Sequence, residues 1–469
     1  MKIHFISLGC KTNQYETNAM EQKFIEKGYD LAEDGEKADI YVVNTCSVTN
    51  IAERKSRQML RRAKENNPNA VIVACGCYAQ VAKDDIIKQI PEVNLILGIN
   101  EKNQIVELVE KYMNDKTSDS QVSDVMHQNE YQEFGSTTYT ELNRAVIKIQ
   151  DGCDRFCTYC IIPYARGKVR SRNPENIIKE IKEVSKEGIK EVSKEGIKEV
   201  VITGIHLASY GKDFNQEKVS KLRKEYNYND DYTQFDPKDD LHTGGFRLIE
   251  LLEQLNNIDE IERIRLGSLE PKLINEEFTY RLSKLKKVCP HFHLSLQSGC
   301  NSTLKRMNRR YTTEEFENSV DLLRKYFSDV MITTDIIVGF PGENDEEFAK
   351  TEKFLEKIKF YKMHVFKYSP KKGTVAEKMP DQIDGNIKEE RSQKLIQLSN
   401  KNETEYNKQY IGKVINVLFE EKDEQGYFKG HTANYLIVKV KNEDNLENEI
   451  LPVMIEKQEN MELFGIIEK

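Results

Sequence analysis

Short apolar runs alternate with longer polar and charged stretches along the first part of the chain. The runs KIHFISLG, ADIYVVNT and AVIVACG are separated by segments rich in Glu, Lys and Gln. Apolar runs of this length, with helical patterns between them, are typical of βαβ units in a parallel sheet. The pattern therefore predicts an N-terminal α/β domain over residues 1–112.

The alternation stops over residues 113–142, which are polar and are predicted to be a linker. It returns over residues 143–375, with six strand patterns: RAVIKIQD, EVVITGI, RIRLGSLE, HFHLSLQS, MITTDIIVGF and MHVFKYS. Six such units in succession predict a parallel sheet that curves into a partial (β/α)6 barrel.

The end of the chain has a different rhythm. Residues 376–408 form a charged helical pattern, and residues 409–469 hold the short runs VINVLFEE, GYFKGHT, YLIVKV and EILPVMI. Closely spaced short strands are typical of a small β barrel. The predicted fold class is thus α/β, with a small β barrel at its C-terminal end.

Two segments interrupt these patterns. IKEVSKEG occurs in tandem at 181–188 and 189–196, which we interpret as a duplication without function. Residues 210–244 are polar and rich in Tyr. A loop of this length inside a domain is either functional or disordered, and the sequence leaves both interpretations open.

Composition narrows the class of protein. A hydrophobic content of 38% is enough for real cores, and 32% charged residues favour a soluble protein. The sequence contains no run of about 18 apolar residues, so it predicts no membrane span. The segment MKIHFISLGC lacks a signal-peptide cleavage region. We therefore expect a cytoplasmic protein without a membrane partner. The net charge of −8 means that nucleic-acid binding would need a local basic patch.

The strongest chemical signal is DGCDRFCTYC, in which Cys153, Cys157 and Cys160 follow a predicted strand with the spacing C-x3-C-x2-C. Nine cysteines without an export signal fit reduced thiols better than disulfides. A structural zinc loop needs four ligands, and no fourth Cys or His lies nearby. Three thiolates instead predict a [4Fe–4S] cluster with one iron open to a ligand.

The apolar runs of the N-terminal domain also end at cysteines, namely Cys10, Cys46 and Cys77. Strand ends of a parallel sheet share one edge, so these thiols are expected to converge on a second cluster. Buried packing is the alternative for each of them. Cys75 lies within the strand and faces roughly as Cys77 does; packing is its predicted role, as it is for Cys289 and Cys300.

C-x3-C-x2-C at the end of the first of six β/α units resembles the radical S-adenosylmethionine (SAM) superfamily. The resemblance implies that the open iron binds SAM, which is cleaved to a 5′-deoxyadenosyl radical. Tyr159 matches the aromatic residue typical of this loop, and DIIVGFPGE resembles the segment that packs against the SAM adenine. Polar or small residues at strand ends are expected to line this site. The predicted cofactor-binding residues are Tyr159, Thr203, Gly204, Ser268, Glu270, Ser295, Gln297, Asp335 and Gly339.

Two three-cysteine sites followed by a small β barrel resemble the methylthiotransferases, radical SAM enzymes that insert sulfur into a C–H bond and methylate it. LGCKTNQYET, NTCSVTN, GCYAQ, DGCDRFCTYCIIPYARGKVRSR and HFHLSLQSGCNSTLKRMNRRYT are similar to family segments. The resemblance implies two [4Fe–4S] clusters, two SAM molecules, an external electron donor of flavodoxin or ferredoxin type, and a TRAM-like RNA-binding barrel. Lys371 stands where the family usually has Arg, which would bind a charged group bidentately.

GCKTNQYET, TGIHL and GHTANY are most similar to the MtaB-type subgroup. This implies a tRNA substrate, with methylthiolation at C2 of N6-threonylcarbamoyladenosine at position 37. The alternatives are the subgroups acting on isopentenyladenosine or on a ribosomal-protein aspartate. From another class, a non-catalytic iron–sulfur or zinc RNA-binding protein stays open.

RNA contacts are expected to be local, because phosphate neutralisation requires clustered cations. Such clusters follow the cysteine loop (Arg166, Lys168, Arg170, Arg172) and the fourth strand (Lys305, Arg306, Arg309, Arg310). For the basic residues after the cysteine loop, contact with the iron–sulfur clusters and SAM is a competing interpretation. On the barrel, an RNA face is predicted from Lys429, His431, Asn434 and Tyr435.

Overall fold

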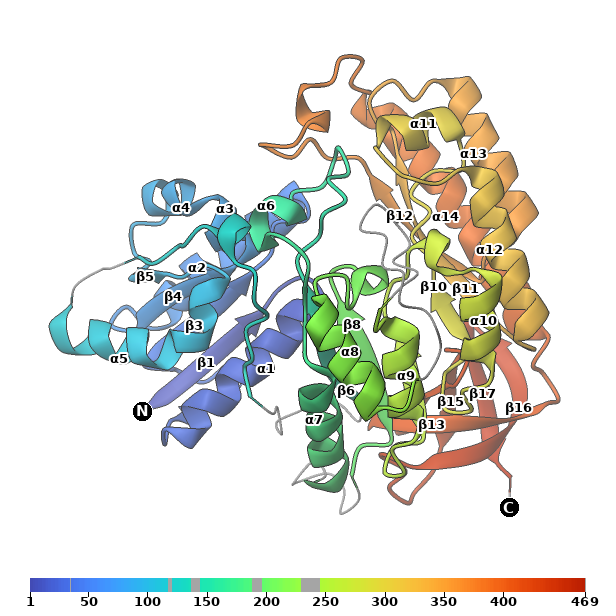
Figure 1. Ribbon diagram of the computed structural model, residues 1–469, viewed down its shortest axis with the longest axis horizontal. Helices are drawn as coiled ribbons and strands as arrows, with labels where there is room; N and C mark the ends of the chain where they lie inside the picture. Colours follow the sequence, from blue (N-terminus) through green and yellow to red (C-terminus); the bar gives the residue numbers. More distant parts are fainter. Residues whose placement is uncertain (34, 117–119, 136–143, 188–195, 229–244, 469) are drawn as a thin grey trace.

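The computed structural model describes residues 1–33, 35–116, 120–135, 144–187, 196–228 and 245–468 (Figure 1). The N-terminal sheet and the C-terminal barrel lie on opposite sides of a central region of strands and helices in this view. The predicted fold class is confirmed, because all three parts are present.

The N-terminal part is a five-stranded parallel sheet in the order β2-β1-β3-β4-β5. Every residue of β3 and β4 is buried, as expected for central strands covered on both faces. One face packs against α1 and α5, and the other against α2 and α4. The elements are β1 (Lys2–Ser7), α1 (Lys11–Glu26), β2 (Asp30–Leu31), β3 (Ile40–Thr45), α2 (Asn50–Asn66), β4 (Val71–Gly76), α3 (Cys77–Val81), α4 (Lys83–Gln89), β5 (Leu95–Ile96), η1 (Asn100–Gln104) and α5 (Ile105–Asp115).

Residues 120–135 of the predicted linker pack against both neighbouring parts. Gln121 bridges to Leu97 beside the first sheet. Val125, in the short helix η2 (Val125–His127), is buried against Cys77 and Ala165. Phe134 packs against Tyr15 of α1. The segment is therefore part of the contact between the two α/β regions.

The central region contains the six predicted parallel strands in chain order. The pairs β6–β8, β8–β9, β10–β11 and β11–β12 are parallel, and isolated bridges such as Leu269–Leu294 connect the β9 and β10 segments. A short strand, β7, is antiparallel to β6 at the edge. These strands are β6 (Arg144–Asp151), β7 (Arg170–Ser171), β8 (Glu199–Gly204), β9 (Arg263–Leu266), β10 (His291–His293), β11 (Met331–Val338) and β12 (Lys362–Lys367).

The helices that cover this sheet share one large apolar core with it. They are α7 (Pro174–Glu187), η3 (Leu207–Ser209), α8 (Gln216–Glu225), α9 (Leu248–Asn256), η4 (Pro271–Leu273), α10 (Glu276–Ser283), α11 (Asn301–Arg306), α12 (Thr313–Tyr326) and α13 (Asp345–Ile358). Two further short helices, α6 (Ile162–Arg166) and η5 (Ala376–Lys378), pack in separate small clusters. Residues 188–195 of the tandem repeat and 229–244 of the long insertion lie outside the described residues.

The helix α14 (Gly385–Lys408) packs on β12 and leads to the predicted barrel, which is confirmed as closed, in the order β13-β14-β15-β17-β16. Closure removes the exposed sheet edges that short antiparallel strands would otherwise leave. Its strands are β13 (Val414–Lys422), β14 (Tyr427–Thr432), β15 (Ile437–Lys441), β16 (Ile450–Glu459) and β17 (Glu462–Ile467). Within the described part of the chain, no helix is long and apolar enough to cross a membrane.

Candidate functional site

Cys10, Cys46 and Cys77 follow three adjacent strands of the N-terminal sheet, β1, β3 and β4. Gly9 precedes Cys10 with φ +102°, and a Cβ there would lie 2.7 Å from the Cys46 Sγ. Glycine is therefore required for the close approach of these two strand ends. Gly76 has φ +95°, and its Cβ would lie 2.5 Å from the Thr45 carbonyl oxygen. We call these three cysteines the N-terminal triad.

The thiols of the N-terminal triad influence one another. Burial, with smaller contributions from the neighbouring Cys77 and Cys10, raises the pKa of Cys46 to about 11. Burial also raises the pKa of Cys77, against the opposing effect of Arg166 and Lys102. Such thiols become thiolates only when a bound cation stabilises their charge.

A fully buried arginine connects this triad to the central region. Arg166 Nε donates to Cys77 Sγ at 3.3 Å. Its Nη1 donates to Glu16 Oε1 at 2.7 Å and to Asp151 Oδ1 at 3.0 Å, and its Nη2 donates to Asn13 Oδ1 at 2.7 Å. Glu16 and Asn13 come from α1, whereas Asp151 and Arg166 belong to β6 and α6. Arg166 therefore joins the two regions through its guanidinium.

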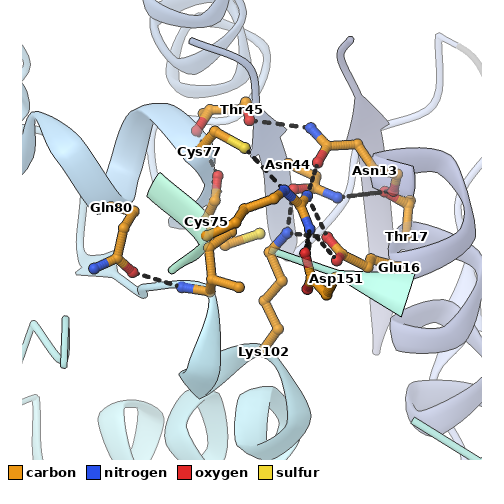
Figure 2. A network of polar contacts seen from close by, with 12 residues as sticks. Asn13, Glu16, Thr17, Asn44, Thr45, Cys75, Cys77, Gln80, Lys102 and Asp151 are labelled. Carbon is orange, nitrogen blue, oxygen red and sulfur yellow. Dashed lines mark hydrogen bonds and ion pairs between the residues drawn. The ribbon is translucent and has the colours of Figure 1, made fainter. Parts of the chain in front are cut away.

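Two lysines complete this buried network, and Figure 2 shows one of them, Lys102, beside Glu16. Lys102 Nζ lies 2.6 Å from Glu16 Oε2, and Lys148 Nζ lies 2.7 Å from Glu16 Oε1 and 2.6 Å from Asp151 Oδ2. Burial alone would raise the pKa of Glu16, but the adjacent Arg166, Lys102 and Lys148 hold it well below its usual range. Arg170 Nη2 also lies 3.6 Å from Asp151 Oδ2, so at least four cations face these two carboxylates in the described structure, and the network has an excess of positive charge beside the Cys77 sulfur.

Cys153, Cys157 and Cys160 lie together on the loop after β6, and we call them the loop triad. Gly152 starts the loop with φ +72°, where a Cβ would lie 1.7 Å from the Lys168 carbonyl oxygen. Burial raises the pKa of Cys153 to about 11 and of Cys160 to about 12, and the neighbouring Cys157 adds to both shifts. The three thiols are therefore neighbours.

A second buried arginine contacts the loop triad. Arg309 Nη1 donates to Cys157 Sγ at 3.4 Å, and Arg309 Nη2 donates to Glu270 Oε2 at 3.0 Å. Burial would raise the pKa of Glu270, but Arg309, followed by His206, lowers it to about 2. Glu270 is thus ionised and fixes the arginine that reaches the sulfur.

The two triads do not present a mononuclear metal site. Among the residues that the structure describes, no group of three or more His, Cys, Asp or Glu side chains is close enough to hold a single metal ion. The cysteines of each triad are neighbours, rather than ligands that meet at one point.

A cavity of about 540 Å³ lies between the N-terminal triad, the strands of the central region and the barrel. Cys10 lines it from the N-terminal sheet, Thr203 and Ser268 from the strand ends, and Tyr435 from the barrel. Its size is typical of a small-molecule or single-nucleoside site. Three parts of the chain that are far apart in sequence thus share one chamber.

Comparisons with known proteins agree with this arrangement. Residues 2–98 match the uncharacterized protein family UPF0004, and residues 147–355 match the radical SAM superfamily. The threonylcarbamoyladenosine tRNA methylthiotransferase MtaB of Bacillus subtilis (strain 168) is 38% identical over 97% of this chain and 94% of that protein. The chain belongs to the radical SAM methylthiotransferase family.

Two further relatives also match this chain over nearly the whole length of both proteins. The protein named threonylcarbamoyladenosine tRNA methylthiotransferase MtaB in Aquifex aeolicus (strain VF5) is 37% identical over 94% of this chain and 96% of its own length. The tRNA-2-methylthio-N(6)-dimethylallyladenosine synthase of Pelotomaculum thermopropionicum is 35% identical over 99% of this chain and 97% of that protein. The methylthiotransferase family therefore accounts for the whole chain.

Radical SAM enzymes use a [4Fe–4S] cluster and SAM. The loop triad fits such a cluster by donor chemistry, because it offers three thiols, and Arg309 donates to one of their sulfurs. The N-terminal triad has the same donor set, with Arg166 in the corresponding position. The second cluster is thus consistent with the residues present.

The predicted SAM-binding residues occupy the carboxyl ends of the methylthiotransferase's central strands. Thr203, Gly204 and Ser268 line the cavity. The Ser295 carbonyl oxygen accepts from Arg309 at 3.2 Å, which brings this strand end beside the loop triad. Glu270, described above, belongs to the same edge. Their contact with SAM stays a prediction.

The remaining predicted SAM contacts lie on and around β11. The Gln297 amide donates to the Asp335 carbonyl oxygen at 2.8 Å, and the Asp335 carboxylate lies 3.2 Å from His293 Nε2. Tyr159 packs edge-on against Phe340, and the Gly339 amide donates to Glu343. These residues lie at the carboxyl-end edge of the central strands, as the strand pattern predicts.

The residues predicted to contact RNA are placed differently. Arg170 and Arg172 are buried, and Arg172 pairs with Glu180 and Glu133 instead of facing solvent. Lys429 is partly exposed on β14, 3.8 Å from Glu421. The structure brings these three cations neither to one face nor to the cavity lining.

His431, Asn434 and Tyr435 face the central region. Asn434 Nδ2 donates to Asp329 Oδ2 at 3.0 Å, and His431 Nδ1 lies 3.0 Å from Glu420. Tyr435 has φ +78° and stacks between His291 and His431, with ring centroids 4.6 and 4.8 Å apart. These side chains fix the barrel to the chamber, and an RNA role for them stays a prediction.

Other singled-out residues have structural partners. Lys371 is buried and pairs with Glu53 of α2, while Asn50 Nδ2 donates to the Pro370 carbonyl oxygen, so this segment closes on the N-terminal sheet beside Cys46. Cys75 packs in the sheet core with Val73 and Leu97, apart from the Arg166 contact of Cys77. Cys289 and Cys300 are buried as well.

Sequence reasoning did not identify Glu16, Lys102, Lys148 and Asp151 as site residues. One signal for them was present, since Lys148 interrupts an otherwise apolar strand, and a buried lysine requires a charged partner.

Proposed function

We propose that this methylthiotransferase acts on tRNA and adds a methylthio group to C2 of N6-threonylcarbamoyladenosine at position 37. The observation that supports the proposal is the shared chamber, which is lined by Cys10 of the N-terminal triad and by residues at the ends of the radical SAM strands. Relatives named for this substrate, 38% and 37% identical over nearly the whole chain, support the choice of nucleoside.

In the proposed reaction, Cys153, Cys157 and Cys160 hold the cluster that supplies the electron for SAM cleavage. A radical route fits the substrate, because the adenine C2–H is too weakly acidic for a side-chain base. Cys10, Cys46 and Cys77 hold the second cluster, beside the nucleoside. Arg309 and Arg166 each donate to one sulfur of a triad and so keep that sulfur oriented. The electron donor is proposed to be an external flavodoxin or ferredoxin.

The test is anaerobic reconstitution with iron, sulfide, SAM and a reductant, followed by incubation with threonylcarbamoyl-tRNA. We expect 5′-deoxyadenosine and a nucleoside heavier by one methylthio group, as measured by mass spectrometry. Absence of 5′-deoxyadenosine would contradict the enzymatic proposal and favour a non-catalytic RNA-binding protein. Nucleosides from a deletion strain test the substrate, since the methylthio-threonylcarbamoyl nucleoside should disappear.

The second candidate substrate is dimethylallyladenosine tRNA. A synthase of that nucleoside's methylthio form is 35% identical over 99% of this chain. The same deletion strain distinguishes the two, because loss of the methylthio-dimethylallyl nucleoside alone would favour this candidate.

A further inference from the structure

The charged residues that line the chamber are paired, with one exception. Arg265 is held by Glu199 at 2.7 and 3.0 Å, and Lys362 is held by Glu403 at 3.0 Å. Lys11 also lines the chamber, but within the described ranges its ammonium group takes part in no hydrogen bond or ion pair. The lining therefore carries one uncompensated positive charge.

Lys11 is held in place by its backbone. It is the first residue of α1, directly after Cys10, and its side chain remains accessible to solvent. Asn13 and Glu16, farther along the same helix, are bonded to the buried Arg166, which fixes the helix end. The fixed helix end limits the positions that the Lys11 ammonium group can reach and keeps it beside the reaction chamber.

The rest of the chamber lining suits a flat heterocycle with a polar substituent. Ile205, Leu266 and Ile437 supply apolar surface. His291 is buried, its Nε2 lies 3.2 Å from Thr333 Oγ1, and its Nδ1 has no hydrogen-bond partner in the described structure. A bound polar group that pairs with this nitrogen would remove the cost of leaving it unsatisfied.

We propose that Lys11 binds the carboxylate of the N6-threonylcarbamoyl group and so selects this nucleoside against one with an apolar N6 substituent. The inference rests on the proposed function and deepens it. A carboxylate neutralises the unpaired ammonium group in a partly desolvated site, where charge pairs are stronger than in water. A dimethylallyl group would instead cover the cation without compensating it, which costs affinity.

The test uses anticodon stem–loop RNAs that carry threonylcarbamoyladenosine, its threonine methyl ester, or unmodified adenosine. Reconstituted wild-type enzyme is expected to bind the acid at least about tenfold more tightly than the ester, the size of a hydrogen bond to a charged group. Lys11→Gln should bind acid and ester equally, and Lys11→Arg should keep part of the preference. Lys362→Gln, a change of the same type at a paired lysine of the same chamber, should leave the ratio of acid to ester affinity unchanged.

Three outcomes would overturn the proposal. In the first, Lys11→Gln keeps the full preference for the acid. In the second, it loses affinity equally for all three RNAs, which would indicate that Lys11 contacts a phosphate. In the third, it changes only the SAM dependence of 5′-deoxyadenosine formation, which would indicate that Lys11 contacts the SAM carboxylate. Iron content reports whether the neighbouring Cys10 still holds its cluster. Wild-type enzyme that methylthiolates only dimethylallyl RNA would refute the proposed function, independently of the variant.

Discussion

The two cysteine triads of this methylthiotransferase are built in different ways. The loop triad lies on one segment after β6, whereas the N-terminal triad collects cysteines from the ends of three strands. The first needs only a local loop conformation, supported by Gly152. The second exists only when β1, β3 and β4 have paired in register. The same set of three thiols can therefore be formed by one loop or by the paired ends of three strands.

Both triads nevertheless share one device, a buried arginine between a sulfur and a carboxylate. Arg309 links Cys157 to Glu270, and Arg166 links Cys77 to Glu16. Arg309 belongs to the same region as its cysteine, whereas Arg166 reaches across from α6 to the N-terminal sheet. The N-terminal triad thus depends on the contact between regions, and the loop triad does not.

The largest expected effect is the loss of SAM cleavage when a cysteine of the loop triad is removed. Cys160→Ala removes one of three loop thiols, so 5′-deoxyadenosine formation should fall to background. The reconstituted variant should keep about half of the wild-type iron, bound at the N-terminal triad. Liquid chromatography and an iron assay measure both quantities. Loss of all iron would show that the two sites do not load independently.

The reverse change tests the other triad. Cys77→Ala should also lose about half of the iron and all methylthio product, yet SAM cleavage should persist. Cys75→Ala is the matched control, because Cys75 is buried in the sheet core two residues away. It should retain both clusters. If Cys75→Ala lost iron and Cys77→Ala retained it, Cys75 and not Cys77 would be the cluster ligand.

The arginine that crosses between regions is expected to matter for stability. Arg166→Met removes the hydrogen bonds that the buried Glu16 and Asp151 carboxylates accept from the guanidinium and leaves these groups to the neighbouring lysines. At about 1.5–3 kcal/mol for each hydrogen bond to a charged group, the free energy of unfolding should fall by about 3–5 kcal/mol. Arg62→Met, on the exposed face of α2, should change it by less than about 0.5 kcal/mol. Urea unfolding of the metal-free proteins gives both values. Equal effects would mean that the network does not depend on this guanidinium.

The smallest predicted effect concerns pH at the loop triad. The pKa of Glu270 is lowered from 4.5 to about 2, so its ionised form contributes stability above the unfolded value. This contribution, about 3 kcal/mol, is lost as the pH falls from about 4.5 to about 2. The difference in unfolding free energy between wild type and Glu270→Gln should therefore shrink over this range. A difference that is constant with pH would show that Glu270 is not held ionised.

Much of this architecture was predictable from local pattern. The six strands and the loop triad follow from periodicity and spacing within short segments, and Cys10, Cys46 and Cys77 follow from strand ends. The partners of Arg166 and Arg309 were not predictable, because their burial depends on contacts between distant segments. Arg166 and Glu16 are 150 positions apart, so no local pattern pairs them, and the sequence predicts for Arg166 only contact with RNA or with the iron–sulfur clusters and SAM. His431 and Asn434 looked like an open barrel face for the same reason, since periodicity carries no information about which domain covers a face.

The place of Tyr435 has a consequence for the synthesis of the protein. Its ring stacks on His291 and lines a chamber that Cys10 also lines. Two residues far apart in the sequence therefore border the same space. A ribosome makes Cys10 long before Tyr435, so the chamber cannot close until the barrel has been made.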